Sequence, residues 1–162
     1  MATLVTRFAL TDTKEEVSPA RHMVIDRMRA WGVPLDGEAA DAIRLVASEL
    51  ITNAVIHGGG RITVTLRHRP GSLVIDVVDS NPLAPKLNCS DTDEGGRGLI
   101  LVGFLAARSG WEPVTRGKRV WAEIALPKSA PAARAAVLRQ FFAARPSPRG
   151  RAAPEPLALA IT

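Results

Sequence analysis

Apolar side chains recur at helical spacing in three segments of the chain. The longest segment should form a helix capped by Asp36 and ending at His57, where the three glycines at residues 58–60 release the chain. The other two helices are expected at residues 18–31, with Ser18 as N-cap, and at residues 97–107. The buried stripe of the longest helix is predicted to consist of Ile43, Val46, Ala47, Leu50 and Ala54. The buried candidates of the other two are Met23, Val24, Ile25, Met28, Leu99, Leu101, Val102 and Leu105.

Alternating apolar and polar residues predict the strands. Residues 5–10 can form an edge strand, and residues 62–67 alternate between apolar side chains and threonine or arginine. A Pro-Gly turn connects the latter to an apolar strand at 72–79, so these two strands form an antiparallel hairpin. Residues 111–115 and 120–126 form a second, closing hairpin.

Length and composition indicate one folded domain followed by a segment of different composition. At 162 residues the chain is long enough for one hydrophobic core, which we assign to residues 1–127. Residues 128–145 could add a C-terminal helix, whereas residues 146–162 are rich in Pro, Arg and Ala and are expected to be disordered. Residues 129–162 carry five arginines and one acid, which is +4 of the net charge of +5. The nearly neutral remainder lacks the charge signature of a nucleic-acid-binding domain.

Neither a membrane segment nor a disulfide is expected. No apolar run reaches the length of a membrane span, and the N-terminus lacks the apolar region of a signal peptide. The single cysteine, Cys89, cannot form a disulfide within one chain and has no neighbouring histidine, so we expect a passive thiol. The expected location is therefore the reducing cytoplasm.

A carboxylate, an amide and an imidazole occupy one face of the longest predicted helix. Glu49, Asn53 and His57 are four residues apart, and each four-residue step rotates the side-chain direction by about 40°. Such residues most often form a solvated face. These three lie beside the buried stripe rather than opposite it, which predicts that they line a pocket at the edge of the core.

Two other segments favour a nucleotide site over a solvated face. Asp79 and Asn81 follow the apolar strand at 72–79, and a carboxylate at a strand end can accept a hydrogen bond from the exocyclic amine of a base. A glycine-rich stretch at residues 94–98 then opens the third helix, so main-chain N–H groups and the helix N-terminus could approach phosphates. Either segment alone would be weak evidence, because strand-end aspartates and glycine-rich loops are common.

Four segments, in this order and spacing, resemble the GHKL ATPase/kinase superfamily. Residues 49–57 resemble its N-box, residues 77–85 a proline-containing variant of its first glycine box, residues 95–102 its second glycine box, and residues 117–124 its closing strand. The resemblance spans residues 3–127, and this short form is most similar to anti-sigma-factor serine/threonine-protein kinases of actinobacterial type. It implies the Bergerat ATP-binding fold, an α/β (α+β) two-layer sandwich with a mixed, mainly antiparallel sheet and helices on one face.

The resemblance also implies a role for each candidate residue. Glu49 would be the catalytic base, Asn53 the Mg²⁺ ligand and Asp79 the acceptor of the adenine amine of ATP. The other expected ATP contacts are His57, Asn81, Gly95, Gly96, Arg97 and Gly98. We expect His57 to bound the pocket rather than act in catalysis, and Arg97 could clamp phosphate or face solvent.

The expected function is that of a cytoplasmic ATP- and Mg²⁺-dependent anti-sigma-factor kinase. By resemblance, its partners are a sigma factor and an anti-sigma-factor antagonist, which it phosphorylates on Ser or Thr. Dimers are usual in the resembled family, but the sequence leaves the oligomeric state open between a monomer and a homodimer. No contact with nucleic acid or membranes is expected. Two departures from the family pattern leave open a non-catalytic anti-sigma binding module, with or without ATP. Residues 79–82 read Asp-Ser-Asn-Pro instead of Asp-x-Gly-x-Gly, and Arg119 replaces a threonine whose hydroxyl is expected near Asp79.

Overall fold

A computed structural model of the chain describes residues 3–33, 35–85 and 97–126. Its elements, in chain order, are β1 Leu4–Leu10, the 3₁₀ helix η1 Lys14–Glu16, α1 Val17–Ala30, α2 Gly37–His57, β2 Ile62–Arg69, β3 Ser72–Asp79, α3 Arg97–Leu105, β4 Arg108–Val114 and β5 Gly117–Ala125. Cys89, Gly95, Gly96, the expected helix at 128–145 and the tail at 146–162 lie outside the described residues.

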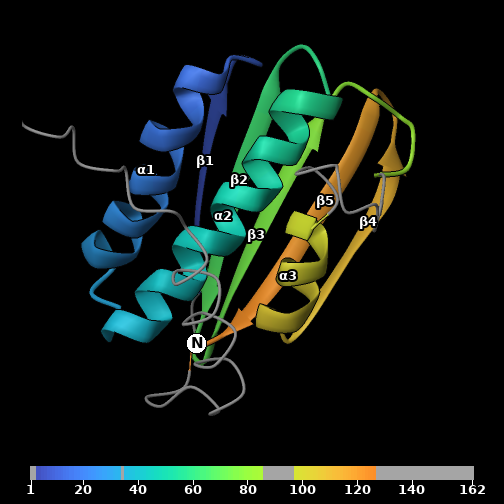
Figure 1. The fold of residues 1–162 in the computed structure, drawn as a ribbon. Helices are drawn as coiled ribbons and strands as arrows, with labels where there is room; N and C mark the ends of the chain where they lie inside the picture. The colour runs from blue at the N-terminus through green and yellow to red at the C-terminus, as the bar shows by residue number, and fades with distance from the viewer. Residues whose placement is uncertain (1–2, 34, 86–96, 127–162) are drawn as a thin grey trace, which may run out of the picture.

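The described strands form one sheet in the order β1-β2-β3-β5-β4. All four pairings are antiparallel, so the sheet is not mixed, in contrast to the expectation. The two predicted hairpins supply β2–β3 and β4–β5, and β1 is the predicted edge strand. Figure 1 shows α1, α2 and α3 on one face of the sheet. The two-layer α+β sandwich is therefore confirmed.

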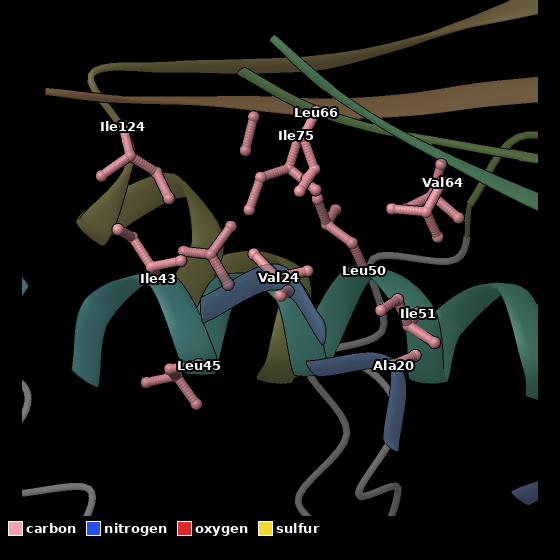
Figure 2. Close-up of a cluster of buried hydrophobic side chains, with 14 of the residues drawn as sticks. Ala20, Val24, Ile43, Leu45, Leu50, Ile51, Val64, Leu66, Ile75 and Ile124 are labelled. Carbon is pink, nitrogen blue, oxygen red and sulfur yellow. The ribbon is translucent and has the colours of Figure 1, made fainter. Parts of the chain in front are cut away.

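The hydrophobic core lies between α2 and the sheet. The predicted stripe of α2 is confirmed, because each of its five residues is at most 1 % exposed. Leu66, Ile75 and Ile124 extend from the sheet toward this helix (Figure 2). Burial of the stripe fixes the rotation of α2 about its axis. It therefore also fixes the direction in which Glu49 and Asn53 project.

Local sequence sets both ends of α2. Asp36 Oδ1 accepts a hydrogen bond from the main-chain N–H of Ala39 at 2.7 Å, as predicted for an N-cap. The helix ends at His57, and Gly59 then turns the chain with a φ of 66°, in the left-handed region that favours glycine. The carbonyl oxygen of Gly59 accepts a hydrogen bond from Ser80 N–H at 3.4 Å. This turn therefore lies beside the end of β3.

The first helix begins without Ser18 as its N-cap, so that prediction is wrong. α1 starts at Val17 directly after η1, and no side chain caps its first turn. The nearby carboxylate of Glu16 accepts hydrogen bonds from the main-chain N–H of Thr11 at 2.7 Å and from its hydroxyl at 2.9 Å. The 3₁₀ turn therefore leads into the helix one residue before Ser18, which the Ser-Pro pair alone does not indicate.

Some predicted burials and element bounds also need correction. Met23 is 42 % exposed, and Leu99 and Leu101 are half-buried rather than buried. The other burial predictions for α1 and α3 are confirmed for Val24, Ile25, Met28, Val102 and Leu105. The strands of the closing hairpin each begin three residues earlier than predicted. Within the described ranges, no helix combines the length and apolar character that crossing a bilayer requires.

Candidate functional site

Asp79 ends β3 in a closely packed part of the fold and is 1 % exposed. Two glycines make room for it. A Cβ atom on Gly58 would lie 2.4 Å from Asp79 Cβ and Cγ, and one on Gly117 would lie 1.7 Å from the Asp79 carbonyl oxygen. The turn after α2 and the start of β5 therefore close around the end of β3.

The two carboxylate oxygens of Asp79 have different surroundings. Oδ1 accepts hydrogen bonds from Lys118 Nζ at 3.0 Å and from the main-chain N–H of Asn81 at 2.9 Å. Oδ2 is buried and has no hydrogen-bond partner among the described residues. A buried carboxylate oxygen without a partner is energetically unfavourable. Oδ2 is thus the atom that can accept a hydrogen bond from a ligand.

Asn81 connects Asp79 to the end of α2. Its side-chain N–H donates to the His57 carbonyl oxygen at 2.6 Å, and its Oδ1 accepts from Leu83 N–H at 3.0 Å. The amide of Asn81 is therefore engaged within the chain, while its main-chain N–H orients Asp79. His57 takes part in this network through its main chain, and its side chain is half-buried.

Asn53 and Glu49 lie on successive turns of α2, as predicted. Asn53 is 6 % exposed, and neither its Oδ1 nor its Nδ2 has a hydrogen-bond partner in the part of the chain that the structure describes. Few buried side-chain amides in folded proteins leave both atoms unsatisfied. The amide of Asn53 therefore marks a position where a polar ligand can bind.

Gly98 allows the N-terminal turn of α3 to pack against Glu49. A Cβ atom on Gly98 would lie 2.1 Å from Glu49 Oε2, so this approach requires a residue without a side chain. Arg97, the first residue of α3, is exposed. The fold thus brings Glu49 on α2 beside the helix N-terminus that follows the glycine-rich stretch.

An apolar cavity of about 240 Å³ lies in the same part of the fold, and none of the polar groups described above is among its lining residues. Its walls come from α2, α3 and the β4–β5 hairpin, together with Pro85. Val120 in its wall follows Lys118 by two residues on the same side of β5, which is about 7 Å along the strand. Apolar walls with a few polar groups nearby are typical of small-molecule sites. The lining residues are Leu50, Pro85, Leu99, Val102, Ser109, Gly110, Trp111, Val120 and Trp121.

Arg119 does not face Asp79, in contrast to the expectation. Consecutive strand residues point to opposite sides, and the register pairs Asp79 with Lys118. Arg119 instead forms an ion pair with Asp76, and its Nη1 donates to Glu112 Oε1 at 2.7 Å. Burial lowers the pKa of Arg119, but the hydrogen bond to Glu112 and the charge of Asp76 outweigh it and raise this pKa. The departure at position 119 therefore falls on the other face of the sheet.

Lys118, whose side chain is paired with Asp79, is a candidate site residue that the sequence interpretation missed. It lies on the same side of β5 as every second residue that follows it, and these residues, Val120, Ala122 and Ile124, are all buried. A lysine in phase with buried apolar residues is almost never found without a partner. The alternation of buried residues along β5 was the signal that could have identified Lys118, whereas Arg119 lies on the opposite side of the strand.

These groups form a candidate small-molecule site: a strand-end carboxylate, a buried amide without a partner among the described residues, and a helix N-terminus, with an apolar cavity in the same part of the fold. The family described as histidine kinase-like ATPase domain matches residues 10–124. The chain therefore belongs to this family, and the matched range includes every site residue described above. No curated protein matches the chain. ATP is accordingly the ligand that the family implies.

Proposed function

We propose that the chain is an ATP- and Mg²⁺-dependent serine/threonine-protein kinase that binds a sigma factor and phosphorylates an anti-sigma-factor antagonist. Family membership supports the use of ATP. The resemblance of the four boxes to anti-sigma-factor kinases supports the two partner classes. The observation that carries the proposal is the placement of Glu49 and Asn53 on adjoining turns of α2, with Gly98 of α3 packed against Glu49.

Asn53 suits the role of metal ligand. Magnesium takes few protein oxygens and completes its octahedral shell with phosphate and water oxygens. The neutral Oδ1 of Asn53 is buried and unpartnered within the described residues, so it can bind a cation without giving up an existing hydrogen bond. The ion would neutralise phosphate charge during transfer.

Glu49 suits the role of general base. As the substrate hydroxyl oxygen bonds to the γ-phosphorus and ADP departs, the carboxylate would accept the hydroxyl proton. Glu49 is half-buried one helical turn before Asn53, which would place a base beside the metal. The N-terminus of α3 adds positive charge where phosphate oxygens would lie.

Asp79 would select the base. Its unpartnered Oδ2 can accept a hydrogen bond from the exocyclic amine of adenine. Guanine presents a carbonyl oxygen at that position, which would repel the carboxylate. The apolar cavity, whose wall includes Val120 two residues after Lys118 on β5, would then receive apolar parts of the ligand.

The test compares Glu49→Ala and Asn53→Ala in ATP binding and in transfer of labelled phosphate to the antagonist. Glu49→Ala should bind ATP and the sigma factor but transfer phosphate about 10²–10⁴-fold more slowly. Asn53→Ala should weaken both Mg-ATP binding and transfer. Asp41→Ala is a matched control, because it removes a half-buried carboxylate two turns from Glu49 on the same helix.

The outcome also separates the kinase from a non-catalytic anti-sigma module. A wild-type protein that binds ATP and the sigma factor but transfers no phosphate to its antagonist would be the binding module. Transfer by Glu49→Ala at the wild-type rate would leave the kinase in place but assign its base elsewhere.

A further inference from the structure

Lys118 is a buried lysine at the point where β3 and β5 meet. It is 1 % exposed and lies directly opposite Asp79 in the strand register. Its Nζ donates to Asp79 Oδ1 at 3.0 Å and to the main-chain carbonyl of Asn81 at 3.3 Å. The side chains of both charged partners are at least 99 % buried. Their interaction is thus shielded from solvent.

A buried pair of this kind needs an explanation other than stability. The desolvation of two charges offsets much of their attraction, and a well-packed apolar pair is often at least as stable. The pair does fix geometry, however. Lys118 and the N–H of Asn81 both bind Oδ1, so the carboxylate cannot rotate freely, and Oδ2 is left without a described partner.

We propose that Lys118 is a positioning residue for base selection, which it achieves by holding the Asp79 carboxylate with Oδ2 directed at the ligand. The proposal rests on the proposed function, because it takes an adenine nucleotide as the ligand. It assigns Lys118 no contact with the base. Lys118 would affect the ligand only indirectly, because its ammonium group compensates the charge of the Asp79 carboxylate and fixes its orientation.

The closing experiment measures the affinities of Mg-ATP and Mg-ITP by calorimetry. Hypoxanthine, the base of ITP, has a carbonyl oxygen in place of the exocyclic amine of adenine and also carries a proton on N1. The change in the ratio of the two affinities from one variant to another therefore reports the hydrogen bond to Asp79. We expect the wild type to prefer ATP by about tenfold or more, as for a hydrogen bond to a charged group. In Lys118→Met the ratio should fall to near one.

Arg119→Met is the matched control. It removes the next residue of β5, which is ion-paired with Asp76 and Glu112 on the opposite face of the sheet. We expect it to lower the melting temperature and to keep the wild-type ratio of ATP to ITP affinity. A purely structural role for Lys118 would give the same result in Lys118→Met, and that result would overturn the proposal.

The double variant Asp79→Asn/Lys118→Met supplies a second test and remains usable if Lys118→Met does not fold, because it leaves no unpaired buried charge. If Lys118 acts through Asp79, the ratio of ATP to ITP affinity in the double variant should equal the ratio in Asp79→Asn alone. A different ratio would mean that Lys118 contacts the base directly. Tighter ATP binding by Lys118→Met would mean that the ammonium competes with the base. Either result overturns the proposal.

Failure of this inference is distinguishable from failure of the proposed function. A wild-type protein that binds no adenine nucleotide removes the proposed function and the inference together. A wild-type protein that prefers ATP over ITP, combined with an unchanged preference in Lys118→Met, removes the inference alone.

Discussion

Close contacts at single glycines hold the candidate site together. Gly58 and Gly117 pack against Asp79 from two sides, and Gly98 packs against Glu49. Gly58 has a φ of −90°, so it is required for space rather than for an unusual backbone conformation. Substitutions at these positions therefore test the packing around each functional side chain without removing that side chain.

Gly58→Ala should displace Asp79 and destabilise the fold. The new Cβ atom would lie 2.4 Å from two Asp79 atoms, and overpacking of this kind typically costs about 1–3 kcal/mol. ATP affinity should fall with it. Gly103→Ala is the control, since nothing lies within 4 Å of its Cβ position in α3, and alanine should stabilise the helix by about 0.5–1 kcal/mol. Urea unfolding and ATP titration of both variants measure the difference, and equal effects would contradict this account.

Gly98→Ala should impair catalysis more than stability. The added Cβ atom would meet Oε2, the end of a flexible side chain, so Glu49 can move aside. We expect the free energy of unfolding to change by less than about 1 kcal/mol, because alanine also favours the helix. Phosphate transfer should fall by about 10²-fold, as for a misplacement of about 1 Å. Wild-type transfer rates in a folded variant would show that the position of Glu49 does not matter.

Site residues on one helix were predictable, whereas the pairing across strands was not. The four-residue spacing placed Glu49 and Asn53 on one face of α2, and their helix forms as expected. Lys118 and Asp79 are 39 residues apart and meet only because β5 pairs with β3 in one register. A shift of one residue would bring Arg119 to this position instead. Alternation along β5 alone does not identify the partner.

At the scale of elements, the two faces of β5 have different roles: one contributes to the core and the candidate site, and the other forms ion pairs. Its helix-covered face carries Lys118 and the core, and its other face carries Arg119 and Glu123. On the face with Arg119 and Glu123, ion pairs connect β5 to the edge strand β4, and one of them joins Arg108 to Glu123. These pairs affect the hairpin on which the cavity wall depends.

The Arg108–Glu123 pair should give the hairpin a pH-dependent stability. The hydrogen bond donated by Arg108 lowers the pKa of Glu123 below its ordinary value of 4.5. Its contribution is therefore complete above pH 4.5 and is lost as the pH falls through the lower pKa of the folded state. Arg108→Ala should cost less than about 1 kcal/mol at neutral pH, because Arg108 is largely exposed.

Urea unfolding of Arg108→Ala and wild type at neutral and acidic pH checks this. The two proteins should converge at low pH, where Glu123 is protonated. Arg29→Ala is the control, because Arg29 and Asp26 form a solvent-exposed pair 3.7 Å apart on α1. A constant difference between Arg108→Ala and wild type at every pH would exclude the carboxylate as the cause.

Element bounds were predictable where a local signal decides them. Asp36 and the glycines after His57 define α2, and the Pro-Gly turn defines the β2–β3 hairpin, whereas the strands of the closing hairpin begin three residues earlier than predicted. The start of α1 was misjudged because the 3₁₀ turn before it carries no distinctive pattern. The antiparallel direction of β1 and of the β3–β5 pair depends on how distant segments pack, which hydrophobic periodicity does not encode.

At the scale of the whole molecule, the residues of the candidate site come from four different elements. Asn53 comes from α2, Asp79 from β3, Gly98 from α3 and Lys118 from β5. These elements meet only in the folded state, so a ligand that binds them all binds the unfolded chain weakly. Ligand binding should therefore raise the stability of the entire domain.

The selectivity for adenine nucleotides tests whether these residues form one binding site. Mg-ATP or Mg-ADP should raise the melting temperature, and at a concentration of about 100 times Kd the gain is about 2.7 kcal/mol. GTP should give no such gain, because its base presents a carbonyl oxygen where Asp79 Oδ2 needs a donor. A thermal-shift series with both nucleotides, with and without Mg²⁺, measures the effect. Equal stabilisation by GTP would contradict base selection by Asp79, and no response to millimolar adenine nucleotides would contradict the site itself.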